Sequence, residues 1–289
     1  MYHNTIMKAF ERNLYIITTA LLLLPAPLAA YDLEFLSQDK LSLNPHAALL
    51  RSHAINVLYT YSEDKNKHYM EFDFGAKIPG ITLRNVSGAD IEIGGAGEVF
   101  TRFQLFSQSF NFIHADFNGT IYTDVRYKRL LFETSIYHTS SHIGDDYILY
   151  DRGVVKNTGY EAIRHYTTFM ADYLDVSVGF DYKLGRRPKR TIFSDPSIFL
   201  GARLDLLSAG IPVFVECDVE VIVGRRLPNV GIRAGVYLKY IFNTIFLKKP
   251  SSGKEPHELA VYFYSGYSKM GYFYDRRETL ILFGPTYRY

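Results

Sequence analysis

The sequence predicts an all-β protein, a transmembrane antiparallel β-barrel of about 12 strands with a short helix near residues 160–170. Three observations lead to this fold class. Apolar and polar residues alternate with a period of two along segments of about nine to eleven residues, longer than the usual strand of a soluble protein. The polar face carries glycines and charges of both signs, which suits a crowded barrel interior. The chain also ends on an aromatic residue, Tyr289, after an alternating apolar segment.

The N-terminus has the pattern of a secretory signal peptide. Lys8 and Arg12 precede an apolar run over 14–24, and the sequence PAPLAA ends at Ala30. We therefore expect a signal peptide over 1–30, with an N-terminal anchor helix as the alternative.

The organisation expected for the rest of the chain is simple. Residues 31–50 form a periplasmic lead-in, and residues 51–289 form a single barrel domain. The predicted location is the outer membrane of a Gram-negative bacterial cell, and a periplasmic or lipocalin-like β protein is the alternative fold.

Composition excludes several classes of protein. Hydrophobic residues make up 47% and charged residues 21% of the 289 residues, so the chain is ordered. A net charge of +2 gives no bulk attraction to nucleic acid, and we expect no nucleic-acid partner. A single cysteine rules out an internal disulfide framework. Tyrosine is abundant and tryptophan absent, and tyrosine also suits a membrane interface.

Eleven segments show the strand pattern. They are 53–61, 68–77, 90–102, 115–127, 130–141, 173–184, 198–207, 211–223, 230–242, 258–268 and 279–289. In 175–183, for example, Val176 and Phe180 share one face while Asp175 and Asp181 share the other. The last segment ends on Tyr289, which predicts recognition by the outer-membrane insertion machinery, and lipid is the other expected partner.

Bacterial single-chain barrels have an even number of strands, so a twelfth is expected. Two segments are candidates. Residues 104–113 place three phenylalanines on one parity and are preferred. Residues 161–170 follow a Thr158-x-x-Glu161 capping box and are predicted to form the short helix.

The sequence YHTSSHIGDDY over 137–147 concentrates polar residues at the end of one predicted strand. On strand 130–141 the even positions carry apolar residues and therefore face lipid, so His138, Ser140 and His142 continue the lipid face. If residues 128–129 form a two-residue turn, Gly119 lies opposite His138.

This placement permits nucleophilic chemistry. Alternate residues on one strand face have Cα atoms about 6.5–7 Å apart, so His138 can act as the base for the Ser140 hydroxyl. Asp145, Asp146 and Glu161 are candidates for the group that orients the ring. A lipid-facing His-x-Ser resembles the outer-membrane phospholipases and lipid A deacylases. His138, Ser140 and Glu161 are thus the candidate catalytic residues.

Plainer interpretations stay open. The preferred interpretation of the stretch is a polar strand end that leaves the membrane. A narrow channel is another alternative, although mixed charges on the lumen face suggest ion pairs that fill the lumen. His138 and His142 are about 13 Å apart along a strand, too far for one zinc ion. Two carboxylates, Asp145 and Asp146, are a thin basis for calcium, and we expect no metal or cofactor.

Two stretches resemble a known family, the proteins grouped as domain of unknown function 1207. YHTSSHIGDDY is similar to that family's H-x-S-S-H-[LI]-G-D-[DE]-[YF] stretch, and NTGYEAI over 157–163 to its N-[YF]-S-x-E segment, from which it departs at Thr158-Gly159. The matching positions are His138, Ser140, Ser141, His142, Gly144, Asp145, Asp146 and Glu161. The resemblance implies an outer-membrane barrel of unassigned activity.

The function predicted from the sequence is therefore an integral outer-membrane barrel with a structural or a lipid- or small-molecule-binding role. An acyl hydrolase and a narrow channel are the alternatives, and whether the protein is an enzyme stays open. The side of the membrane depends on the twelfth strand. With both termini in the periplasm, a helix over 161–170 places the motif on the periplasmic side, and a strand there places it outside.

Overall fold

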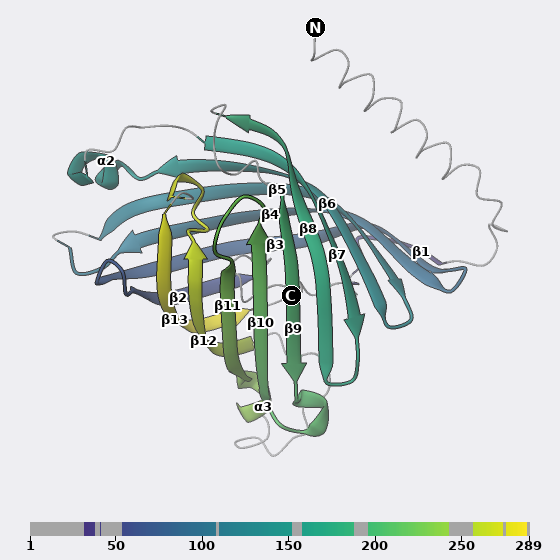
Figure 1. Cartoon of the computed structure of the whole chain (residues 1–289). Coiled ribbons are helices and arrows are strands. Elements are labelled where there is room, and N and C mark those ends of the chain that lie inside the picture. Colours follow the sequence, from purple (N-terminus) through teal and green to yellow (C-terminus); the bar gives the residue numbers. More distant parts are fainter. Residues whose placement is uncertain are drawn as a thin grey trace, which may run out of the picture.

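The computed structural model describes residues 32–37, 41, 54–107, 110–151, 158–187, 196–242, 257–273 and 276–287. The predicted signal peptide and the last two residues lie outside this range. Strands β2 to β13 form a closed antiparallel barrel of twelve strands, because β3 pairs with both β2 and β4 and β13 pairs with β2 (Figure 1). A short additional strand, β1, pairs with β3.

The strands are β1 (Asp32–Phe35), β2 (Ile55–Ser62), β3 (Lys67–Val86), β4 (Ala89–Gln104), β5 (Asn111–Tyr127), β6 (Leu130–Ile143), β7 (Thr158–Met170), β8 (Leu174–Arg187), β9 (Ser197–Asp205), β10 (Val213–Ile222), β11 (Asn229–Tyr237), β12 (His257–Tyr267) and β13 (Arg277–Tyr287). Short helices are α2 (Asp145–Asp151) and α3 (Leu238–Phe242), with 3-10 turns η3 (Leu207–Ala209) and η5 (Gly271–Phe273). No helix in the described ranges is long and apolar enough to cross a membrane.

The predicted barrel is confirmed, but the position of the twelfth strand was wrong. Residues 158–170 form β7, where the sequence predicted a short helix, and residues 104–113 contain the end of β4, a connection and the start of β5. β7 pairs with β6 on one side and β8 on the other. A helix there would leave both of those edges unpaired in lipid, so barrel closure overrides the local capping pattern.

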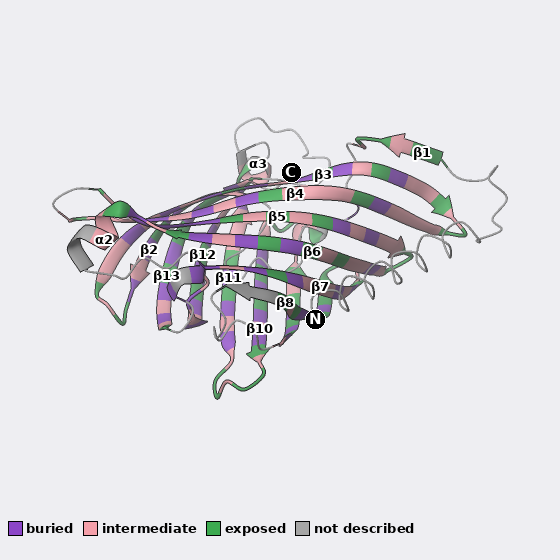
Figure 2. Ribbon diagram, turned by 90° about the horizontal axis from the view of Figure 1, so that it is seen from above, coloured by how far each residue is buried: buried purple, intermediate pink, exposed green. Residues whose placement is uncertain are grey.

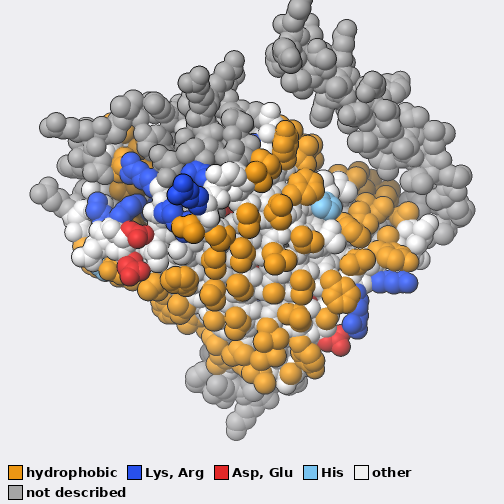
Figure 3. Space-filling model, in the orientation of Figure 1, with side chains coloured by type: hydrophobic (Ala, Val, Ile, Leu, Met, Phe, Trp, Pro, Cys, Tyr) orange, Lys and Arg blue, Asp and Glu red, His pale blue; other side chains and the backbone are white. Residues whose placement is uncertain are grey.

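Alternation of the two faces is confirmed along the strands. On β8, Val176, Val178, Phe180 and Tyr182 face outward and are 40–52% exposed, whereas Ser177 and Asp181 are buried inside. Figure 2 shows the same banding of buried and exposed positions along the ribbons. The outward side chains form a continuous apolar surface over the visible strands (Figure 3). One side of the sheet therefore suits lipid and the other suits a packed polar interior.

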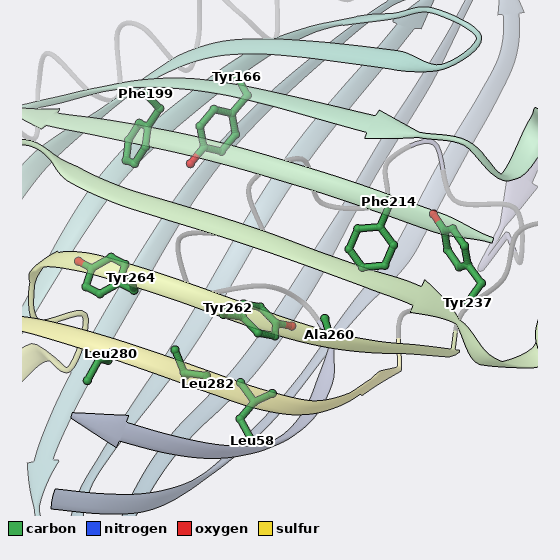
Figure 4. Close-up of a cluster of buried hydrophobic side chains, with 10 residues drawn as sticks. All are labelled: Leu58, Tyr166, Phe199, Phe214, Tyr237, Ala260, Tyr262, Tyr264, Leu280 and Leu282. Carbon is green, nitrogen blue, oxygen red and sulfur yellow. The ribbon is translucent and has the colours of Figure 1, made fainter. Parts of the chain in front are cut away.

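Ion pairs fill the barrel interior. Arg233 is fully buried, donates to Glu216 at 3.1 Å, and also pairs with Glu258. Arg102 donates to Glu71 at 2.8 Å and to Glu278 at 2.9 Å. Between such groups lies a cluster of buried apolar and aromatic side chains, shown in Figure 4: Leu58, Tyr166, Phe199, Phe214, Tyr237, Ala260, Tyr262, Tyr264, Leu280 and Leu282. In its described part the interior therefore holds both ion pairs and packed aromatic side chains.

The two ends of the barrel differ. The start of β2 and the end of β13 meet where Ile55 pairs with Tyr287, and we call this the terminal end. The opposite end, here the distal end, holds α2, η5 and the turn between β10 and β11. Because β7 is a strand, β6 runs from the terminal end to the distal end, and the 137–147 motif lies at the distal end. The helix interpretation had placed it on the side of the termini.

Part of the predicted lead-in is attached to the barrel. β1 pairs with the portion of β3 near its terminal end, from Ile81 to Arg84. Leu41 is 1% exposed, and its backbone N–H donates to Glu92 Oε2 at 3.2 Å. Glu92 also accepts a hydrogen bond from the Tyr122 hydroxyl at 2.9 Å. These contacts hold the N-terminal segment against the barrel wall.

We predict that Arg233→Ala lowers the free energy of unfolding by about 3–5 kcal/mol, because the buried Glu216 and Glu258 lose one of the two arginines that pair with them and keep only Arg203. Arg129→Ala is the matched control, since Arg129 forms an exposed pair with Asp172 at 3.3 Å, and such pairs contribute about 0–1 kcal/mol. Urea titration of the folded protein in lipid vesicles measures both. Equal stabilities of the two variants would contradict a structural role for the interior pairs.

Candidate functional site

The hairpin of β5 and β6 determines which residues of the motif share a face. Val125 pairs with Phe132, Gly119 with His138 and Phe117 with Ser140, as the two-residue turn predicts. Lys128 adopts a φ of 54°, the left-handed conformation in which such turns usually place glycine or asparagine. His138, Ser140 and His142 therefore occupy three successive outward positions of β6.

His138 is paired with a carboxylate on the neighbouring strand. Register places His138 opposite Glu161 of β7, and His138 Nδ1 lies 3.1 Å from Glu161 Oε1. Both side chains are about half exposed on the outer surface, at 56% and 53%. Because a carboxylate oxygen accepts, the Nδ1–H of His138 donates, which leaves Nε2 available for another partner.

Ser140 is hydrogen-bonded to the second imidazole. Ser140 Oγ lies 3.0 Å from His142 Nε2. The His142 ring packs edge-on against Phe117, with ring centroids 5.6 Å apart and an interplanar angle of 77°. This contact between β5 and β6 holds the imidazole beside the hydroxyl.

Glycines border the two central residues of this set. Gly119 lies beside His138, and a Cβ added there would meet no atom within 4 Å. Gly159 lies beside Ser140 on β7, and its added Cβ would stand 3.8 Å from His138 Cε1. Missing side chains on both sides leave room for another molecule to approach His138 and Ser140.

The remaining motif residues lie elsewhere. Ser141 faces the interior, is nearly fully buried, and lies against Gly271 of η5. Gly144 follows β6, and Asp145 and Asp146 begin α2. Asp146 Oδ2 accepts from the Phe112 backbone N–H at 2.9 Å, tying α2 to the start of β5. These positions build the end of the hairpin.

The structure thus brings His138, Ser140, His142 and Glu161 together and separates them from the other candidates. Sequence reasoning did not identify the Ser140–His142 bond or the roles of Phe117 and Gly159, although strand parity and register carried that information. Within the described ranges there is no group of three or more His, Cys, Asp or Glu placed to hold a metal ion. A hydroxyl beside an imidazole, with a carboxylate on a second imidazole, has the components of nucleophilic catalysis.

The closed barrel with an apolar outer surface defines the class of outer-membrane β-barrels, and solved structures agree. The outer membrane phospholipase (OMPLA) dimer of Salmonella typhi with bound calcium is similar with a TM-score of 0.60 and 12% identity, covering 87% of this chain and 94% of that chain. Outer membrane phospholipase A of Escherichia coli, solved as an active-site mutant, gives 0.60 and 13%, covering 87% and 93%. At these identities the likeness shows the fold alone.

The family of proteins of unknown function DUF1207 matches residues 43–194, more than half of the chain. The chain belongs to this family, which confirms the predicted resemblance. No curated protein matches.

We predict that Gly144→Ala lowers the free energy of unfolding by about 1–3 kcal/mol, because the added Cβ would lie 2.0 Å from the Phe112 carbonyl oxygen. Gly119→Ala adds the same methyl group in open space and should change stability by less than about 0.5 kcal/mol. The midpoint of heat conversion from folded to unfolded protein, followed by gel electrophoresis, compares the two. A midpoint for Gly144→Ala at the wild-type value would contradict the close approach at the end of β6.

Proposed function

We propose that the protein is an acyl hydrolase of the bacterial outer membrane that cleaves ester-linked acyl chains of membrane lipids with Ser140 as nucleophile. One observation carries this proposal. On the outer surface of β6 the Ser140 hydroxyl is hydrogen-bonded to one imidazole and lies next to a second, carboxylate-paired imidazole. Polar groups that face lipid are costly, which favours a functional reason for them.

The height of the site on the barrel suits an ester substrate. Toward the terminal end the same face of β6 carries the apolar side chains of Ile136 and Phe132, with Thr134 between them. Ser140 lies four residues beyond Ile136, about 13 Å along the strand. Lipid esters lie between acyl chains and headgroups, so an ester in the leaflet at the distal end reaches this serine. With both termini in the periplasm, that leaflet is the outer one.

The proposed roles of His138 and His142 follow from the hydrogen bonds of their ring nitrogen atoms. Glu161 accepts the Nδ1–H of His138, which fixes the orientation and tautomer of the ring and leaves Nε2 as the acceptor. His138 is therefore the general base. Ser140 lies between His138 and His142 on one strand face, so rotation about χ1 transfers its hydroxyl from the His142 bond to His138. His142 holds the hydroxyl in the resting state.

The proposed reaction has two stages, formation of an acyl-enzyme on Ser140 and its hydrolysis. Ser140 Oγ attacks the ester carbonyl carbon as His138 Nε2 takes the hydroxyl proton. The tetrahedral intermediate collapses, the bond to the alcohol oxygen breaks, and His138 returns the proton to that oxygen, which releases a lysolipid. Water, deprotonated by His138, attacks the acyl-enzyme, and the fatty acid leaves as Ser140 regains its proton.

Two features of the fold support the assignment of a lipid hydrolase. The similar barrels from Salmonella typhi and Escherichia coli are named as phospholipases, so the fold is compatible with lipid hydrolysis. The described interior charges Arg233 and Arg102 are paired with carboxylates, whereas the Ser140 set lies on the outer surface.

The test is release of fatty acid from phospholipid by the full chain refolded in mixed micelles. We expect Ser140→Ala to abolish release, and His138→Asn and Glu161→Gln to lower kcat by at least about 100-fold. His142→Asn should lower kcat by less than about tenfold, because it removes a resting-state bond.

His165→Asn is the control, since His165 lies on the same outer surface of β7 and bonds Thr134 at 2.9 Å and Thr167 at 3.1 Å, away from Ser140. Its activity should match wild type. Equal release by wild type and Ser140→Ala would remove the hydrolase. A larger loss for His142→Asn than for His138→Asn would overturn the assignment of the base.

A further inference from the structure

A second polar site occupies the outer surface at the distal end, on strands away from the proposed active site. Tyr267 and Arg277 form the last pair of β12 and β13, and Arg225 lies in the turn after β10. The Arg225 guanidinium carbon is 4.3 Å from the centroid of the Tyr267 ring, and that of Arg277 is 5.3 Å from it. Two cations thus share one aromatic ring, a favourable contact for each.

Among the described residues, Arg225 and Arg277 differ from the interior arginines in their hydrogen-bond and ion-pair partners. Arg225 Nε and Arg277 Nη1 are buried, and neither has a hydrogen-bond acceptor among the described residues. No carboxylate of the described chain forms an ion pair with either side chain, whereas Arg102 and Arg233 each contact two. Buried charged donors without acceptors are costly, and an anion from outside the chain would satisfy them.

The aromatic platform is held in place. The Tyr267 backbone N–H donates to Asn229 Oδ1 at 2.7 Å, and the Tyr267 carbonyl accepts from the Tyr264 hydroxyl. Asn229 is buried and donates in turn to Glu220 at 2.8 Å. The backbone that carries the Tyr267 ring is therefore held by a side chain of β11 and by one of β12 itself, and a binding site requires such support.

The cluster lies where headgroups are expected. Toward the terminal end the same outer faces of β12 and β13 carry Phe263, Ile281 and Phe283, each more than 40% exposed. Along these strands an apolar surface is followed by the tyrosine and then by the guanidinium groups. Acyl chains, interface and phosphates follow one another in the same order in a bilayer. Figure 3 shows a group of lysine and arginine side chains at the upper left border of the apolar surface and a second group at its lower right border.

From these observations we propose that Arg225, Tyr267 and Arg277 bind the phosphate group of an anionic lipid in the membrane leaflet at the distal end. A guanidinium offers paired N–H donors that match phosphate oxygens, and two guanidinium groups beside the same ring can bind one phosphate together. The site is independent of Ser140 and requires no hydrolysis.

The test is native mass spectrometry of the folded full chain in detergent, titrated with ether-linked phosphatidylglycerol, which an acyl hydrolase does not cleave. We expect one tight phosphatidylglycerol site. Arg225→Gln and Arg277→Gln should each weaken it at least tenfold, and Tyr267→Leu should weaken it as well. Heat conversion on gels confirms that each variant is folded.

Arg226→Gln is the matched control, because Arg226 is an exposed arginine of the same turn, whereas Arg225 is the residue of that turn that lies over the Tyr267 ring. It should bind like wild type. An equal loss in Arg226→Gln would mean general attraction to a basic rim and would overturn the site. Ether-linked phosphatidylcholine binding as tightly would overturn selection of an anionic lipid. Inorganic phosphate competing at the same concentration as the lipid would assign the site to free phosphate and overturn the lipid assignment.

Discussion

The structure depends on one constraint, that backbone N–H and C=O groups inside a bilayer find partners only within the protein. A closed ladder of twelve strands satisfies them, and β3 completes it by pairing with both β2 and β4. The alternation of side chains follows, because each strand then has lipid on one side and the interior on the other. The same constraint makes residues 158–170 a strand, since β6 and β8 both need a partner there.

Closure of the barrel also gives its inner and outer faces different side chains. The interior holds many charges, but Arg233 and Arg102 each lie between two carboxylates, and the aromatic cluster fills the space beside them. That arrangement stabilises a core. The outer surface is apolar along most of its height, so polar groups on it stand out. The Ser140 set and the Arg225–Tyr267–Arg277 cluster both lie at the distal end of the barrel.

Sequence patterns predicted the barrel, eleven of its strands and the lipid-facing parity of His138 and Ser140, because a period of two is a local property. They also predicted the β5–β6 register residue by residue, since a two-residue turn leaves no freedom in the pairing. The prediction failed at β7. The capping box that suggested a helix is a local pattern, whereas the pairing with β6 and β8 that makes the segment a strand depends on residues distant in the sequence. That one error reversed the end of the barrel assigned to the motif and concealed Glu161 as the cross-strand neighbour of His138.

The 137–147 motif contains both outward-facing polar residues of β6 and residues that fix the end of that strand, because it lies where the strand ends. Outward positions of such a strand can carry chemistry, but only if the strand stays paired as far as the rim. The Gly144 backbone N–H donates to the Ile113 carbonyl at 2.9 Å, and Asp146 accepts from Phe112 at 2.9 Å, so the start of β5 is held against the end of β6. That pairing places Phe117 beside His142, which in turn lies beside Ser140. Gly144 and Asp146 therefore hold the end of β6 that carries Ser140 without touching the serine, as the proposed site requires.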